Sequence, residues 1–213
     1  MNFLTLCQRT REKAGIAGSG PLTTVSQIGE SGRVVNYVRE AYEELQNKHL
    51  WSFLRRSFEF NTTVAEGHYL KSIVANTSSW KTNSFRCYKN VADEQFIDFL
   101  EWDEFRDLYL RGLQRTQPGR PIKFTVEPDF SLRFWPIPDD VYVINGEQYR
   151  MNHEFASDTD VPLFDKFHWL IIYSALEKYA QHVGDPAVYS GSERDHRKLA
   201  RAFEFEYLPK ITV

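Results

Sequence analysis

The chain has 213 residues, and its hydrophobic fraction of 42% and charged fraction of 26% are those of a globular protein with a hydrophobic core. The formal net charge of −3 excludes the basic excess that marks most dedicated nucleic-acid binders. The opening segment lacks the apolar core of a signal peptide, and the longest apolar run is about half the length that spans a bilayer, so we expect a soluble protein of a reducing compartment without membrane contact.

The first part of the chain predicts two helices. Residues 2–14 form a short helix that Gly15 ends in the manner of a C-cap, and a loop rich in glycine follows. A long helix is predicted from about 31 to 55, because apolar residues recur there at helical spacing. They form one stripe made of Val34, Val38, Ala41 and Leu45. This stripe is expected to pack while the opposite, charged face meets water.

The middle of the chain predicts strands, because its apolar residues recur with a period of two. The alternating positions are Phe58, Phe60, Thr62 and Val64, and then Phe85 and Cys87. A turn at Pro128 and Asp129 predicts a further strand pair. Across this turn Ile122, Phe124 and Val126 are expected to oppose Leu132 and Phe134.

Two features of this middle region need a separate interpretation. The dipeptide Asn145-Gly146 is typical of a tight hairpin, but the segment around it could equally be one long strand with a glycine bulge, which we favour slightly. One helix is predicted near 102–115, with Phe105, Leu108 and Tyr109 on its inner side.

Two further helices are predicted at the C-terminal end. The stretch VPLFDKFHWLIIYSALEKYAQHVGDP, residues 161–186, is interpreted as one helix. Asp185 as N-cap and Pro186 at the first helical position then start a second helix, which Pro209 ends.

Helices at both ends and strands between them predict an α+β fold. Residues 1–55 and 162–207 are expected to form a helical bundle. Residues 56–161 are expected to form an inserted antiparallel β domain that contains the helix near 102–115, and residues 208–213 to form a C-terminal tail. Because the bundle's helices are far apart in sequence, the β domain is an insertion into it.

The helix that follows Val161 is apolar on more than one side. Phe167, Leu170 and Ile171 point away from its main apolar face, so something must cover them as well. We expect these three residues to form a subunit interface with a second copy of the chain. The alternative cover is the helix of the β domain, through Leu108 and Tyr109.

No pattern of catalytic or metal-binding residues is found. The two cysteines, Cys7 and Cys87, match no metal or redox spacing, and the six histidines include no pair one helical turn apart. His168 is interpreted as a satisfied core or interface histidine. Acidic residues gather at a helix N-terminus, where the helix dipole favours them: Glu101, Asp103, Glu104 and Asp107. We therefore predict no enzyme, no catalytic residue, no metal and no cofactor.

The order of segments resembles that of the head-to-tail adaptor (connector) proteins of tailed bacteriophages, in particular short-tailed ones. The resemblance covers nearly the whole chain. In order, its segments are NFLTLCQRTREKAGIAGSGP, the long helix ending at HLWSFLRRSF, FIDFLEWDEFRDLYLRG, QPGRPIKFTVEPD, SLRFWPIPDD, the strand ending in EQYR, VPLFDKFHWLIIYSALEKY, and a closing helix ending in LPKI. Residues 71–84 depart from the family's pattern, and the role of Trp80 is left open.

The resemblance implies a structural role in the virion. Adaptors of this kind form a ring of twelve copies beneath the portal protein, extend the DNA channel and offer an attachment surface for the tail or nozzle protein. Double-stranded DNA would pass through the lumen during ejection without specific binding. The mildly negative net charge agrees, because phosphate contacts are what make DNA binding strong. The protein would be assembled in the host cytoplasm and reside at the head-tail junction.

The resemblance also implies a portal-binding segment. In related adaptors a C-terminal extension embraces the portal, and in this chain that role would fall on Leu208, Pro209, Lys210, Ile211, Thr212 and Val213. A β-branched tail after a helix end can add to a partner's groove or sheet edge.

Two other functions stay open from the sequence. One is a tail-completion or nozzle component, whose partner would be a tail tube. The other, less favoured, is a metal-dependent enzyme at the same vertex, with the acidic residues 101–107 holding the ion.

Overall fold

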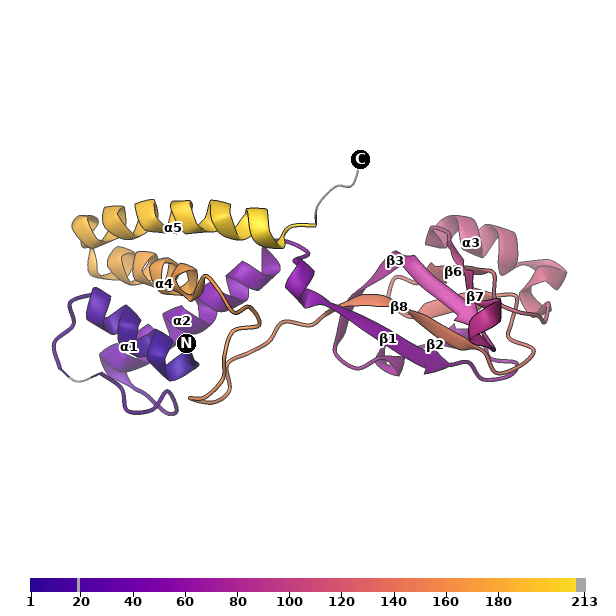
Figure 1. Ribbon diagram of the computed structural model, residues 1–213, viewed down its shortest axis with the longest axis horizontal. Helices are drawn as coiled ribbons and strands as arrows, with labels where there is room; N and C mark the ends of the chain where they lie inside the picture. The colour runs from indigo at the N-terminus through magenta and orange to yellow at the C-terminus, as the bar shows by residue number, and fades with distance from the viewer. Residues whose placement is uncertain (19, 210–213) are drawn as a thin grey trace. The chain divides into compact units, whose positions relative to one another are not determined.

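The computed structural model describes residues 1–18 and 20–209 and has the predicted α+β fold. The chain divides into two compact units, seen as a group of helices and a group made mainly of strands in Figure 1. The helical unit contains Met1–Leu54 and the chain from Asn152 onward, and the β unit is Arg55–Met151. Within the described ranges, none of the helices combines the length and the apolar character needed to cross a bilayer.

The described residues of the helical unit form four α-helices: α1 (Phe3–Lys13), α2 (Gly29–Asn47), α4 (His168–Val183) and α5 (Pro186–Tyr207). Helix α4 packs against all three others, and Figure 1 shows it between α5 on one side and α1 and α2 on the other. Its buried residues are Leu170, Ile171, Ile172, Ala175, Leu176, Tyr179 and Ala180. Residues from both ends of the chain therefore share one hydrophobic core.

The helix starts follow from local hydrogen bonding. The Asn2 side chain accepts from the backbone nitrogen of Thr5 at the start of α1. Asp185 accepts from the backbone nitrogens of Ala187 and Val188 and so caps α5, with Pro186 following it as predicted. These side chains satisfy donors that the first helical turn leaves free.

Two long helices of this unit are shorter than predicted. Helix α2 ends at Asn47 and not near residue 55, because the Trp51 indole turns back and donates to the Leu45 carbonyl at 2.6 Å. Helix α4 begins only at His168, since Phe167 adopts a left-handed conformation with φ of 64°. A helix cannot continue through such a residue.

The segment 152–161 belongs to the helical unit, whereas the sequence predicts it in the β domain. Its backbone is bonded to the first helix: Phe3 N donates to Asp160 O at 2.7 Å. The buried Gln46 side chain of α2 also bonds both the backbone N and O of His153, at 2.9 and 3.0 Å. These contacts come from distant parts of the chain, so local patterns do not reveal them.

The β unit contains two four-stranded sheets. One has the order β1-β8-β3-β4, made of β1 (Arg55–Asn61), β3 (Thr77–Tyr88), β4 (Gln95–Phe96) and β8 (Val143–Arg150). The other has the order β2-β7-β6-β5, made of β2 (His68–Tyr69), β5 (Asp98–Phe99), β6 (Lys123–Val126) and β7 (Leu132–Trp135). The pairs are antiparallel except β5 with β6, which is parallel and departs from the predicted all-antiparallel domain.

The predicted strand pair around Pro128 is confirmed. Strands β6 and β7 pair in the expected register, with Phe124 opposite Phe134 and Val126 opposite Leu132. The hairpin alternative at Asn145-Gly146 does not form: β8 is one long strand, the alternative favoured from the sequence, and it pairs with β1 without a break. The irregularity lies in the partner strand β3, between Lys81 and Arg86. Gly146 leaves room for the Phe58 ring, whose Cζ would lie 3.0 Å from an added Cβ.

Helix α3 (Trp102–Tyr109) is shorter than the predicted 102–115, and a 3-10 helix, Gly112–Thr116, follows it. Phe105 is fully buried and Tyr109 stacks on Trp135, with ring centres 4.2 Å apart, whereas Leu108 is exposed. The stretch 71–84, which the sequence leaves unplaced, supplies a 3-10 helix and the first part of β3. In it, the Trp80 indole is buried and donates to the Phe130 carbonyl.

Candidate docking surfaces of the helical unit

Two of the six predicted portal-binding residues lie in the described part of the chain. Leu208 follows the last turn of α5: its backbone nitrogen donates to the Glu204 carbonyl at 2.9 Å, and its ψ of 143° turns the chain into an extended path. Pro209 is exposed. Lys210, Ile211, Thr212 and Val213 lie outside the described residues. The tail therefore begins as extended chain at the end of α5.

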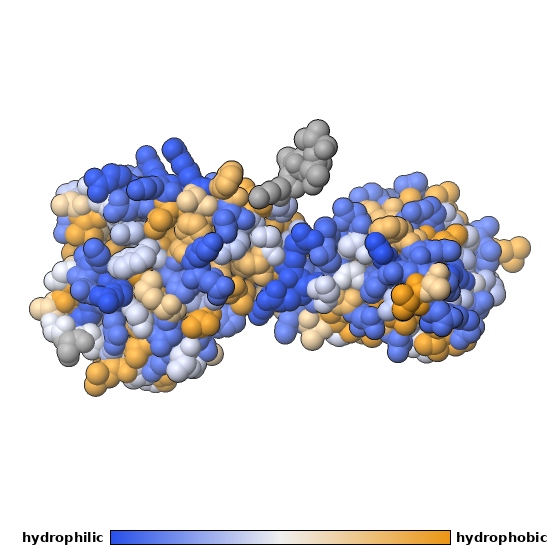
Figure 2. All heavy atoms as spheres, in the orientation of Figure 1, coloured by the Kyte–Doolittle hydropathy of each residue, from blue (hydrophilic) through white to orange (hydrophobic). Residues whose placement is uncertain are grey.

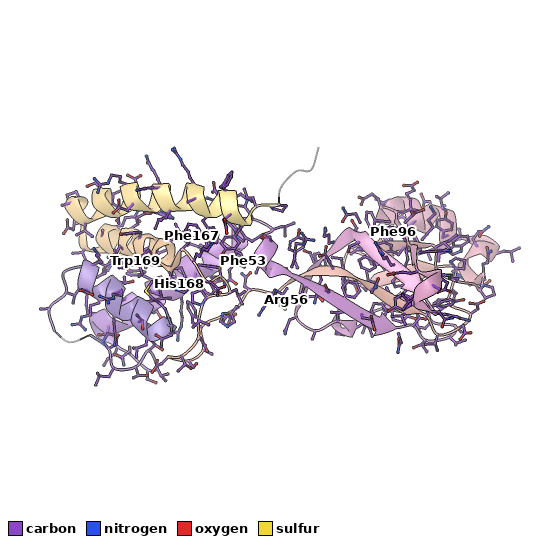
Figure 3. All side chains as sticks on the ribbon, viewed as in Figure 1. Phe53, Arg56, Phe96, Phe167, His168 and Trp169 are labelled. Carbon is purple, nitrogen blue, oxygen red and sulfur yellow. The ribbon has the colours of Figure 1, made fainter. Side chains whose placement is uncertain are left out.

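An aromatic cluster anchors this end of α5. Phe203 is fully buried at its centre, and its ring centre lies 4.8 Å from Trp51 and 4.9 Å from Phe164. The Tyr207 ring is equally close, at 4.8 Å, and the rings of Phe53 and Phe167 lie at 5.9 and 5.7 Å. Figure 3 labels Phe53 and Phe167 at this end of the unit. The cluster joins the segment after α2, the segment before α4 and the last turns of α5.

Charged residues border the aromatic cluster. Lys48, which follows α2, donates to Glu204 of α5 at 2.6 Å, and this hydrogen bond lowers the pKa of Glu204. Lys166 pairs with Glu206 at 3.3 Å. Phe205, between the two glutamates, points into solvent and is 82% exposed. The base of the tail is thus well packed and carries one large apolar side chain on its surface.

The predicted interface residues occupy different environments. Leu170 and Ile171 are 1% and 0% exposed, because α1, α2 and α5 of the same chain enclose α4. Leu170 and Ile171 are thus covered almost entirely within the chain, so a second copy would find little of their surface to contact. The alternative cover, Leu108 and Tyr109 of α3, belongs to the β unit and is not needed either. Phe167 is half-buried against Phe203 and Tyr207 and stays a candidate contact.

His168 and Trp169 start α4 and are labelled in Figure 3. His168 Nε2 bonds the Phe164 carbonyl at 2.8 Å, and its Nδ1 lies 2.6 Å from the Met1 nitrogen. Burial lowers the pKa of His168, which favours the neutral ring. The histidine is therefore satisfied by backbone groups, as predicted. The Trp169 ring is partly exposed, with the Lys13 ammonium 5.8 Å from its centre.

A groove of about 190 Å³ runs between α2, α4 and α5. Its apolar lining consists of Ala41, Leu45, Trp51, Leu170, Ala200 and Phe203. Polar groups at its edge come from Glu44, Lys48, Ser174, His196 and Glu204. The groove adjoins the aromatic cluster, since Trp51 and Phe203 line both, and it is large enough to hold one apolar side chain of a partner.

The loop between α1 and α2 carries an exposed apolar set that the sequence patterns miss. Leu22 and Ile28 are 85% and 87% exposed, and Val25 is 54% exposed. The loop is nevertheless held in place: the Thr24 backbone nitrogen and hydroxyl both donate to Asp158 Oδ1, at 2.6 and 2.5 Å. Apolar residues scattered in a loop show no periodicity, so no sequence signal separates them from buried ones.

Two of the four acidic residues at the start of α3, Asp103 and Asp107, are paired with arginines. Arg106 lies 3.0 Å from Asp103, and Arg111 lies 2.8 Å from Asp107. Over residues 1–18 and 20–209, no group of three or more histidine, cysteine, aspartate or glutamate side chains is placed to hold a metal ion. Both cysteines are free and buried, and burial raises the pKa of Cys7 to about 12.

Comparison with known proteins adds one finding. A family model described as SU10 adaptor protein matches residues 1–207, which include the helical unit, the β unit and the whole of α5. No curated protein matches the chain.

Proposed function

Because the chain belongs to the SU10 adaptor protein family and is a bacteriophage head-to-tail adaptor, we propose that it forms a ring that docks beneath the portal protein. The ring would contain twelve copies, extend the DNA channel and attach the tail or nozzle protein. The observation that carries this proposal is the family match over residues 1–207, since it takes in both compact units.

The proposed role is structural. A virion adaptor acts through its surfaces, so we propose no catalysis, no metal and no cofactor. Arginines offset part of the acidic charge near α3: Arg106 pairs with Asp103 and Asp107, and Arg111 with Asp107. We place the protein in the virion at the head-tail junction, after assembly in the host cytoplasm.

Portal binding is assigned to the tail formed by Leu208, Pro209, Lys210, Ile211, Thr212 and Val213. Support comes from the start of this tail, where Leu208 leaves α5 in extended conformation over a buried aromatic cluster. A rigid base lowers the entropy that a binding segment loses when it docks. Extended, β-branched residues suit addition to a sheet edge or groove of a partner.

A chain ending at Tyr207 is expected to lose the portal complex. The six removed residues would contribute the contacts with the portal, and their loss should weaken binding by at least about 3 kcal/mol, two decades in Kd. Native mass spectrometry of the chain mixed with its portal protein measures this directly. The full-length chain should give a complex of equal copies, and the truncated chain should give free portal.

The matched control keeps residues 208–213 but reverses their order, which preserves length and composition. Circular dichroism of both variants checks that α5 is intact. Equal portal binding by the truncated chain would contradict the assignment of the tail. Failure of the full-length chain to bind any portal would contradict the adaptor role beneath the portal, and a tail-tube protein would be the next partner tested.

Contact between copies in the ring is assigned to the exposed apolar residues of the loop between α1 and α2. Exposed apolar groups that a well-held loop presents are typical of protein contacts. In a closed ring this surface would meet a different surface of the neighbour, such as the groove between α2, α4 and α5 or the partly exposed Phe167.

The double substitution L22S/I28S is therefore expected to weaken ring assembly while the fold is kept. Each side chain, when buried by a neighbour, contributes about 1.5–3 kcal/mol, so the loss should be tenfold or more per residue. Sedimentation velocity of the portal-bound assembly measures its size, and therefore whether the ring has formed. The control L50S/V183S removes two other exposed apolar side chains of the same unit, which are 57% and 54% exposed. Equal weakening in both variants would reject the loop as the contact.

A further inference from the structure

The outer face of α5 carries a stripe of positive charge. Its members are Arg194, Arg197, Lys198 and Arg201, all exposed. The spacings of three, four and seven residues put them on one side of the helix. They line one shallow depression together with Ser190 and Glu193. Figure 2 shows hydrophilic residues along the edge of the helical unit where α5 runs.

This stripe is unusual for the chain that carries it. The whole protein has 26 basic and 29 acidic residues, yet four cations occupy two turns of one helix face. Arg194 and Lys198 are four residues apart, as are Arg197 and Arg201, so like charges repel along the helix. This repulsion destabilises the helix unless anions of the chain itself, or from outside it, compensate it.

The acidic residues close to the stripe compensate it only in part. Glu193 pairs with Arg197 at 2.6 Å, and Arg194 lies 3.4 Å from the adjacent Asp195. No ion pair formed among the described residues includes Lys198 or Arg201. Arg201 does have a carboxylate nearby, since Lys48 chiefly, and Arg201 more weakly, lower the pKa of Glu204. The internal acids therefore leave part of the stripe's positive charge available to an external anion.

The chemistry of the stripe favours phosphate over a protein partner. Three of its four cations are arginines, whose planar guanidinium donates in pairs to phosphate oxygens. A stable protein interface has a buried apolar centre, often with aromatic residues. The stripe from Arg194 to Arg201 has none at its centre, and Phe205 lies one turn beyond it, beside the tail.

The length of the stripe also fits a regular polyanion. Seven residues separate Arg194 from Arg201, which is about 10 Å along the helix axis. Double-stranded DNA carries one negative charge about every 1.7 Å along its axis, so a stripe of this length meets several phosphates in any register. Contacts that do not depend on register hold the duplex loosely and let it slide.

We propose that the outer face of α5 is a sequence-independent contact surface for double-stranded DNA, made by Arg194, Arg197, Lys198 and Arg201. The inference deepens the proposed function and rests on it, because an adaptor ring is the setting in which duplex DNA passes this chain. The surface guides the duplex by salt-sensitive contacts. The small number of charges keeps the hold weak enough for movement.

DNA binding by the full-length chain tests the proposal. Fluorescence anisotropy with a labelled duplex of about 30 base pairs, titrated between about 20 and 150 mM NaCl, gives the affinity and its salt dependence. The variant R194Q/R197Q/K198Q/R201Q should bind at least tenfold more weakly at the lowest salt. Its slope of log K against log salt should fall by up to about 3.6, at about 0.9 per lost phosphate contact. Two duplexes of unrelated sequence should bind equally.

The matched control is R9Q/K13Q/R33Q/K166Q. It removes four exposed cations from the same unit, outside the stripe. Both variants change the formal net charge from −3 to −7, because each loses four positive charges. The control should keep its affinity within about threefold of the unaltered chain, since the contacts with phosphate remain.

Three results would overturn the proposal. The unaltered chain could fail to bind either duplex at the lowest salt. Both variants could lose affinity equally, which would make binding a matter of net charge. The stripe variant could keep DNA binding but lose the portal complex, which would assign the stripe to a protein partner. Portal binding is measured separately, so a chain that binds portal without DNA rejects this inference and leaves the proposed function standing.

Discussion

Replacing Phe203 by alanine is expected to destabilise the helical unit by about 3–5 kcal/mol, the range for a fully buried phenylalanine in a core. The side chain is completely buried, and the five aromatic rings around it come from three separate segments of the chain. Removing the ring deletes its contacts and leaves a cavity that rigid neighbours cannot close. The affected helices should unfold at lower urea concentration.

The measurement is urea unfolding followed by helical ellipticity. The control is Phe205→Ala, two residues further along α5, where the ring is 82% exposed. It should change stability by less than about 0.5 kcal/mol, because no packed contact is lost. If the two variants unfolded alike, the aromatic cluster would not hold the base of the tail. The Phe203→Ala variant should also bind portal more weakly, since a loosened base raises the entropy lost on docking.

Replacing Phe85 by alanine is the second large expected effect, of about 3–5 kcal/mol on the β unit. Phe85 lies in β3 and is fully buried, and its ring stacks on Phe124 of β6 with centres 4.2 Å apart. It also contacts Phe58 and Trp80, with ring centres at 5.1 and 5.9 Å. One side chain thus joins the two sheets, because β3 and β6 belong to different ones.

Tryptophan fluorescence during urea unfolding measures this loss, since Trp80 is buried beside Phe85. The control is Phe96→Ala in β4, labelled in Figure 3, whose ring is 63% exposed. That change removes a contact in which the Arg86 guanidinium lies 4.3 Å from the ring centre, and it should cost no more than about 1 kcal/mol. An equal cost for both variants would mean that the two sheets do not depend on the Phe85–Phe124 stack.

The sequence is informative where structure depends on neighbours along the chain. Asp185 and Pro186 predicted the start of α5, and the start is there because a cap is a bond between residues two or three apart. The pairing of Phe124 with Phe134 was predicted for the same reason, since a short turn fixes the register of the strands beside it. The family resemblance rests on many such local segments in order, and the match over residues 1–207 confirms it.

The candidate surfaces were only partly predictable. The sequence shows that α4 is apolar on more than one side, but it does not show which element covers each side. We expected a second copy of the chain to cover part of α4, and in the structure α1, α2 and α5 of the same chain pack against it. Leu22 and Ile28 gave no signal at all, because exposure of a loop residue depends on contacts such as Thr24 with Asp158, 134 positions apart. The stripe on α5 is periodic in the sequence, but only the structure separates the exposed cations from those already paired.

The sequence by itself determined the α+β class, the start of α5, the pairing of β6 with β7 and the adaptor family. All of these depend on period, capping or segment order, which are properties of residues near one another or of the chain read in order. The tertiary structure alone decided that segment 152–161 joins the helical unit, that Leu170 and Ile171 are buried within one chain, and where the free surfaces lie. Burial is set by residues far apart in sequence, since each side of a helix is covered by whichever element folds against it.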